Sequence, residues 1–510
     1  MRKVTAMSSP ATKDAARDEL EVAAAESESP APANRWLVLV VVCFAQFMVV
    51  LDATIVNVAL PSIGHGLHFS ESDLQWVINA YTLVFGGFLM LGGRASDLIG
   101  RKRLFVAGLI LFSGASLLNG LASSSGMLIG FRALQGLGAA LVSPAALSIV
   151  TTSFPDSRER AKALGVWSAI AISGSAFGLL LGGVLTDALS WQWIFFVNVP
   201  IGVLTVLTAL RFVPESKVEM AQRSFDLAGA LTVTAGLVVI VYAVVGTEKH
   251  GWGSALTLGL LAIGIALLSA FVAIESRATF PLMRLAIFKV KSLAIADGAL
   301  LLVSSGMFSM FFFASLYVQD VLHYSPLTAG FAFLPITVGI MIGAGLSQVL
   351  MRRIGLRGTS GIGLVLATAG MAWLTRIPVD GAYLPDLFAG LMPLSIGLGL
   401  VFVPITLLAT SGVDGDDAGV ASGLFNTAQQ VGGSLGLAVL SSLAADRTSS
   451  LLGSGGASKA LTDRALVDGF HVAFIGGTVL MALAGVLVVG VMRRRHIAHV
   501  DVSAPVVVGA

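Results

Sequence analysis

The sequence has few charged residues, and this scarcity decides its class. Only 12% of its 510 residues are charged, whereas 56% are hydrophobic. A soluble domain of this length would carry about twice that charged fraction. Apolar runs of about 18 or more residues recur along the chain, and each is long enough to cross the hydrocarbon of a bilayer. The sequence therefore predicts a polytopic membrane protein.

The chain also lacks the residue clusters that catalytic and metal sites require. Its one cysteine, Cys43, excludes an intramolecular disulfide. The seven histidines are dispersed among loops and chain ends, and no nucleotide-binding loop is visible. We therefore expect no metal, no cofactor, no nucleic-acid partner and no direct coupling to ATP. A membrane-embedded enzyme is a remote alternative, and a non-transporting sensor would carry a recognisable soluble output domain.

Fourteen segments have the composition and length of membrane spans. They cover approximately 36–60, 75–93, 104–122, 127–150, 163–186, 193–213, 226–246, 254–275, 292–318, 328–351, 359–377, 385–409, 418–443 and 469–492.

Basic residues alternate between the two sides of these spans. About 25 of the 31 Lys and Arg residues lie in the tails and the even-numbered connections, and one, Arg132, lies inside a span. The positive-inside rule then places both termini in the cytoplasm and the protein in the cytoplasmic (inner) cell membrane. Residues 1–34 are expected to be a disordered tail, 496–510 a second cytoplasmic tail, and the Ser/Gly-rich segment 446–469 a flexible external loop.

The connection after the second span carries a recognisable motif, "GGRASDLIGRKRLF" (92–105). Glycine permits a tight turn there, and the basic cluster anchors the cytoplasmic face. The motif resembles the loop signature of the major facilitator superfamily, and an echo with Gly355 and Arg357 follows the tenth span. The residues that match the signature are Gly93, Asp97, Gly100, Arg101 and Lys102.

Further segments resemble the 14-helix drug:proton antiporter branch of that superfamily. The fourth span holds "RALQGLGAA" (132–140), similar to the arginine motif of the superfamily. The fifth span is similar to the glycine-rich antiporter signature, through Gly165, Gly174, Gly178, Gly182 and Gly183. The resemblance extends from residue 36 to residue 495.

This resemblance implies an all-α fold of two six-helix bundles, 35–213 and 284–495, with two additional central helices in 214–283. It also implies proton-coupled efflux of amphipathic, drug-like compounds by alternating access, driven by the proton gradient and carried out by a monomer. A dedicated exporter of one endogenous metabolite or antibiotic is the main alternative. A nutrient symporter is less favoured, because the fifth span resembles the antiporter signature.

Two charges inside spans are expected to form a pair. Asp52 lies about 12 Å short of the outer end of the first span, and Arg132 about 8 Å below the same surface. Opposite charges at similar depth are normally tolerated in a membrane by pairing. We expect Asp52 to carry the coupling proton and Arg132 to tune its affinity. A purely structural ion pair is the alternative.

Helix geometry alone also predicts a role for the glycines of the fifth span. Gly174, Gly178 and Gly182 recur every four residues and form one smooth stripe that permits another helix to approach closely. Gly165 lies on the opposite face, so the stripe does not explain it.

For the other polar residues inside spans, the sequence leaves two roles possible. Asp297 lies near the cytoplasmic start of its helix, where it would line an inner vestibule or simply be hydrated at the interface. Interhelical hydrogen bonding and substrate contact are rival roles for the neutral residues Asn57, Asn79, Asn426, Gln429 and Gln430. The run 307–317 offers Met and Phe for an adaptable apolar pocket or for the lipid-facing surface.

Overall fold

The structure is a computed structural model that describes residues 34–216, 226–278, 281–283, 285–410, 418–452 and 458–492. All regular elements in these ranges are helical, which satisfies backbone polar groups inside each segment, as a bilayer requires. The first eight are α2 (Arg35–Leu67), α3 (Glu71–Leu74), α4 (Trp76–Ile99), α5 (Arg101–Gly120), α6 (Ser125–Ser153), α7 (Ser157–Ala188), α8 (Trp193–Phe196) and α9 (Asn198–Phe212). Next come α10 (Leu227–Val245), α11 (Thr247–His250) and α12 (Ala255–Arg277).

The remaining helices belong to the second half of the chain. They are η1 (Leu285–Lys289), α13 (Lys291–Leu316), η2 (Tyr317–Val321), α14 (Pro326–Leu374), η3 (Tyr383–Phe388), α15 (Ala389–Thr410), α16 (Ala418–Leu452), α17 (Lys459–Gly485) and η5 (Val486–Val491).

Polar side chains fix where several of these helices begin. Ser124, Ser254 and Ser325 each accept a hydrogen bond from the backbone N–H three residues ahead. The Asp156 carboxylate accepts two such bonds at the start of α7. These caps satisfy N–H groups that have no partner within the helix.

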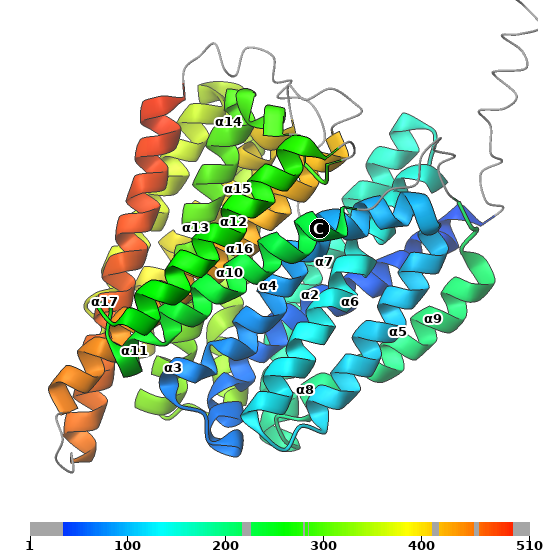
Figure 1. Cartoon of the computed structure of the whole chain (residues 1–510). Helices are drawn as coiled ribbons and strands as arrows, with labels where there is room; N and C mark the ends of the chain where they lie inside the picture. The colour runs from blue at the N-terminus through cyan, green and yellow to red at the C-terminus, as the bar shows by residue number, and fades with distance from the viewer. Residues whose placement is uncertain are drawn as a thin grey trace, which may run out of the picture.

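The helices form two groups with a pair between them. Helices α2 to α9 pack among themselves, as do α13 to α17. Helices α10 and α12 pack against each other, and α10 also contacts α4 and α16, so the pair lies between the two groups (Figure 1). The division at residues 213/214 and 283/284 stays a prediction.

The two groups meet mainly where α2 packs on α13, α4 on α16, and α7 on α14. At the end predicted to be external, the Ser315 hydroxyl donates to the Asn57 carbonyl at 2.5 Å. The Gln319 amide donates to the Val58 carbonyl at 2.8 Å. These contacts hold the two groups together at that end.

Twelve helices among the described residues are long and apolar enough to cross a membrane. One of them, α14, has a non-helical residue at Gly355, with φ 73° and ψ 174°, and includes most of the spans predicted over 328–351 and 359–377. Helix α16 covers the span predicted over 418–443 but is not among the twelve. The number fourteen therefore stays a prediction.

Two expected loops are wrong in part. Most of 446–469 is helical, because α16 runs to Leu452 and α17 begins at Lys459 behind the Ser458 cap. No loop separates the tenth and eleventh predicted spans, because one residue, Gly355, suffices to turn the chain. The tail 496–510, and 1–34 apart from Asn34, lie outside the described residues.

Candidate functional site

Asp52 and Arg132 form an ion pair inside the first group of helices. Asp52 on α2 is fully buried, and Arg132 on α6 is 1% exposed. The Arg132 Nη1 atom lies 2.6 Å from Asp52 Oδ2. The contact expected from their matching depths is therefore present, and helix rotation turns the two side chains toward each other.

Arg132 has partners on two helices besides α2. Its Nε donates to the Val77 carbonyl of α4 at 2.9 Å, and its Nη1 also donates to Gln135 Oε1 at 2.7 Å. Its guanidinium carbon lies 4.3 Å from the centre of the Tyr81 ring. These contacts fix the plane of the guanidinium, which a lysine ammonium would not reproduce.

The Asp52 carboxylate accepts two further hydrogen bonds that the sequence did not predict. Gln135 Nε2 and Asn198 Nδ2 donate to Asp52 Oδ1 at 2.8 and 2.9 Å. The network continues from Asn198 to Ser116 on α5 at 3.1 Å, and from Gln135 to Asn119 at 2.7 Å. Charge-assisted bonds of this kind are stronger than neutral ones, so Asp52 joins α2 to α6 and α9.

A signal for one of these missed residues was in the sequence. Gln135 follows Arg132 by three residues, which places both on one face of α6. Asn198 has no such signal, because nothing in the local sequence indicates that α9 meets α2 at Asp52.

The glycine stripe of α7 lies against α2. A Cβ atom built on Gly174 would lie 3.3 Å from the Phe47 carbonyl oxygen, and one on Gly182 would lie 2.8 Å from that of Ile55. Gly183 faces α14 instead, with the Pro326 carbonyl 2.7 Å from its Cβ position. Within the described part of the chain, no atom of another helix lies within 4 Å of the Cβ position of Gly165. The close approach predicted from the four-residue spacing is present. A role for these residues in antiport stays a prediction.

The loop motif fixes the junction of α4 and α5. Gly100 has a φ of 118°, a conformation that other residues rarely adopt. Arg101 Nη2 lies 3.0 Å from Asp97 Oδ1, and Lys102 Nζ donates to the Leu210 carbonyl near the end of α9 at 2.8 Å. Gly93 lies on α4 beside Pro144 of α6. The motif therefore connects α4, α5, α6 and α9.

The second half repeats part of this arrangement. Gly355 also has a positive φ, and Arg357, two residues later, donates to the Val489 carbonyl. Leu210 and Val489 each lie two residues before the end of the last helix of their group. The shared geometry supports two halves related by an internal repeat.

The neutral polar candidates do not join the Asp52 network. Asn57 and Asn426 donate to carbonyls of their own helices, while Asn79 donates to Gln75 Oε1 at 3.3 Å. Gln430 packs beside Gly86 of α4, and Gln429 is half-buried on α16.

Asp297 on α13 is a buried carboxylate outside the Asp52 network. It is 6% exposed, and neither carboxylate oxygen has a hydrogen-bond partner among the described residues. A buried charge without a partner is costly, which makes Asp297 a candidate for contact with a ligand or proton.

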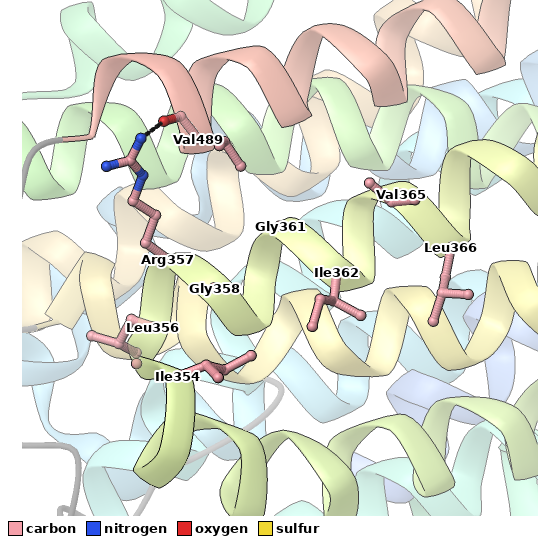
Figure 2. Close-up of a pocket in the computed structure, with 10 residues that line it drawn as sticks. Ile354, Leu356, Arg357, Gly358, Gly361, Ile362, Val365, Leu366 and Val489 are labelled. Atoms are coloured by element: carbon pink, nitrogen blue, oxygen red, sulfur yellow. Dashed lines mark hydrogen bonds between the residues drawn. The ribbon is translucent and has the colours of Figure 1, made fainter.

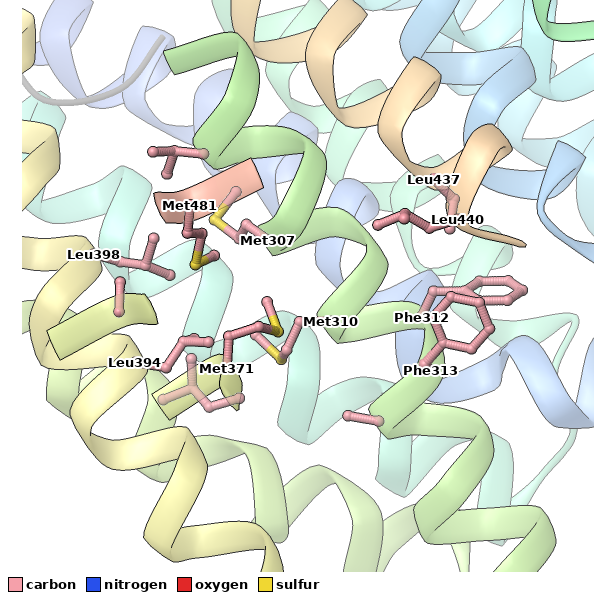
Figure 3. Packing of buried hydrophobic residues seen from close by; sticks show 14 of the residues in the cluster. Met307, Met310, Phe312, Phe313, Met371, Leu394, Leu398, Leu437, Leu440 and Met481 are labelled. Atoms are coloured by element: carbon pink, nitrogen blue, oxygen red, sulfur yellow. The ribbon is translucent and has the colours of Figure 1, made fainter. Parts of the chain in front are cut away.

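The Met/Phe run 307–317 contributes mainly to packing. Met310, Phe312 and Phe313 are buried, and they lie in a cluster with Met371 and Met481 from α14 and α17 (Figure 3). Neither the lipid-facing alternative nor an open pocket describes these three side chains.

No group of three or more His, Cys, Asp or Glu side chains in the described ranges is placed to hold a metal ion.

These features define a class of protein, a polytopic helical membrane protein with a charge pair buried in its first half. The sequence profile of the Major Facilitator Superfamily matches residues 42–437. The chain belongs to the Major Facilitator Superfamily, whose members move small substrates across membranes.

Characterised relatives share most of the chain. The puromycin resistance protein pur8 of Streptomyces alboniger is 40% identical over 91% of this chain and 93% of its own length. The cephamycin export protein CmcT of Amycolatopsis lactamdurans is 41% identical, covering 81% and 85%. The multidrug resistance protein Stp of Mycobacterium tuberculosis is 35% identical, covering 91% and 85%.

Solved structures support the fold. A bacterial homologue of the human lysosomal transporter Spinster, in an inward-facing and unoccupied conformation, aligns with a TM-score of 0.63 at 16% identity. The alignment covers 91% of this chain and 97% of that one.

Proposed function

We propose that this protein exports amphipathic, drug-like compounds across the cell membrane in exchange for protons, by alternating access between its two groups of helices. The observation that carries the proposal is the Asp52–Arg132 pair, which is buried and held by donors from α6 and α9. An ionisable residue inside a membrane is by default a candidate for an ion or proton pathway. The names of the relatives support drug efflux in particular.

Protonation of Asp52 would change how three helices are joined. The ionised carboxylate accepts bonds from Arg132, Gln135 and Asn198, and all three are strengthened by its charge. A proton on Asp52 removes that charge and weakens the hold of α2 on α6 and α9. The protonated and ionised forms would therefore favour different arrangements of these helices, which is the requirement for coupling.

The proton gradient supplies enough free energy for this task. One charge that moves down ~100 mV releases about 2.3 kcal/mol, which supports a roughly 50-fold substrate gradient.

The α4–α16 contact is where we place the substrate path. The Thr82 and Ser434 hydroxyls form a hydrogen bond across it, and Thr427 donates to the Gly86 carbonyl at 3.1 Å. Asn79 Oδ1 and Gln430 Oε1, on these same helices, are buried and have no partner among the described residues. Such acceptors are suited to bind a water or a polar group of a substrate when the two helices separate.

A dedicated exporter of one antibiotic is the second candidate. The names of pur8 and CmcT each give a single compound, puromycin or cephamycin. A membrane-embedded enzyme is disfavoured, because the superfamily consists of transporters. We also propose a monomer without a cofactor, with both termini in the cytoplasm.

A resistance screen tests the proposal. Cells that express the protein should survive higher concentrations of several unrelated amphipathic compounds, and a protonophore should abolish the protection. Protection against one compound alone would identify a dedicated exporter. Protection that persists with the protonophore would refute proton coupling.

A further inference from the structure

A groove lies beside the kink of α14, away from the Asp52 network. Its volume is about 920 Å³, and its walls come from α14 at and after the kink, from Ile354 onward, and from η5 (Figure 2). Gly358 and Gly361 line the groove without side chains that would fill it, while Ile362, Val365 and Leu366 supply apolar surface.

The apolar wall of this groove is open to the surroundings of the protein. Ile354 is 46% exposed, Ile362 is 44% exposed and Val365 is 69% exposed. In a membrane protein, an exposed apolar wall on a spanning helix contacts acyl chains. The groove is therefore shaped and positioned for a lipid chain.

Three arginines lie within six residues of one another at the kink of α14, and one of them lines the groove. Arg357 lines it, and one amino group of Arg357 donates to the Val489 carbonyl (Figure 2). Arg352 and Arg353 are exposed on the other side of the kink. Among the described residues, none of these three arginines has a carboxylate within 4.0 Å.

In the corresponding loop of the first half, acidic side chains neutralise the basic ones. Aligning Gly100 with Gly355 places Lys102 at the position of Arg357 and Asp97 at that of Arg352. In the first half, Asp97 pairs with Arg101 at 3.0 Å, and Glu215 lies 3.5 Å from Arg103. The second half replaces the acidic residue by a basic one, so residues 352–358 carry positive charge and no carboxylate, and such a cluster attracts anionic lipid head groups.

We propose that this groove binds an anionic phospholipid. The phosphate lies at Arg352, Arg353 and Arg357, and an acyl chain lies along Ile362 and Val365. Arginine suits this role because its planar group bonds phosphate oxygens in pairs. The loop lies on the face predicted to be cytoplasmic, where bacterial and other membranes expose anionic lipids.

Native mass spectrometry of the purified full-length chain tests the proposal. The protein is titrated with phosphatidylglycerol and with phosphatidylcholine of the same acyl chains. We expect preferential retention of phosphatidylglycerol, and a loss of about fivefold in its affinity for each arginine that Arg352→Gln and Arg353→Gln remove. The matched control, Arg103→Gln, removes the same charge from the loop of the other half and should leave retention unchanged.

A second variant tests the groove itself without changing charge. Val365→Trp fills the acyl wall at an exposed position, and it should reduce retention of phosphatidylglycerol while the thermal melting temperature stays the same. Equal retention of the two lipids, an equal effect of Arg103→Gln, or unchanged retention in Val365→Trp would each overturn the proposal. A lipid-free dimer that Val365→Trp abolishes would assign the groove to a second copy of the chain instead. These experiments measure lipid binding alone, so their outcome does not depend on whether the protein exports compounds in exchange for protons.

Discussion

Gly178 of α7 lies against the backbone of α2 at Leu51, the residue before Asp52. A Cβ atom on Gly178 would lie 2.9 Å from the Leu51 carbonyl oxygen and closer still to the Thr54 hydroxyl. The glycine stripe therefore sets how near α7 approaches the helix that carries the buried carboxylate. The turn of α2 that packs against Gly178 is therefore the turn that carries Asp52.

Gly178→Leu should abolish transport, because its side chain would push α7 away from α2 and move Asp52 relative to Arg132. Gly114→Leu on α5 is the matched control, since Gly114 is exposed, belongs to no motif, and has no neighbouring atom of another described helix within 4 Å of its Cβ position. Efflux from cells with equal amounts of each variant in the membrane is the measurement. Normal efflux by Gly178→Leu would refute the close-packing role.

Asp52→Asn should eliminate proton-driven efflux while passive substrate exchange persists, since exchange requires only that the two halves alternate. The substrate gradient, up to roughly 50-fold in the wild type, should collapse toward unity. Asp187→Asn makes the same chemical change at an exposed carboxylate and serves as the control. The decisive readout is substrate-induced proton release in reconstituted vesicles. Release at the native rate by Asp52→Asn would make Asp52 a structural charge.

Arg132→Leu should lower the thermal stability of the purified protein, because it leaves Asp52 buried without its counter-ion. Removal of one partner of a buried pair costs about 3–5 kcal/mol. Replacing both residues, with Asp52→Leu and Arg132→Leu, should recover much of the stability but no transport. If the double variant still transports against a gradient, the pair has no role in coupling.

Asp297→Asn should weaken export of cationic compounds more than export of neutral ones. Its carboxylate is buried and has no partner within the described part of the chain, so a bound cation would neutralise it. Minimum inhibitory concentrations for a cationic and a neutral compound of similar size provide the comparison. An equal change for both compounds would remove Asp297 from substrate selection.

The predicted orientation is checked with reporters. A reporter fused after His499 should behave as cytoplasmic, and one inserted near Ser454 as external, because basic residues concentrate in the tails and even-numbered connections. An external C-terminus would overturn the fourteen-span prediction.

The sequence by itself determined the features that depend on composition and depth. Scarce charge and long apolar runs specify a membrane protein, since hydrocarbon excludes unpaired polar groups. The rise of a helix per residue fixes depth, which is why Asp52 and Arg132 were recognised as partners from their positions alone. The four-residue glycine spacing likewise predicted a close helix contact.

Only the tertiary structure decided which faces of the helices meet. Depth says nothing about rotation or about which helices are neighbours, so Asn198 was not recognised as a donor to Asp52. Because the sequence does not say which helices are neighbours, it could not decide whether Met310 and Phe313 line a pocket or face lipid. The structure shows that α14 and α17 cover them. Local sequence sets helical pattern and depth, whereas contacts between residues more than 100 positions apart depend on how the helices pack.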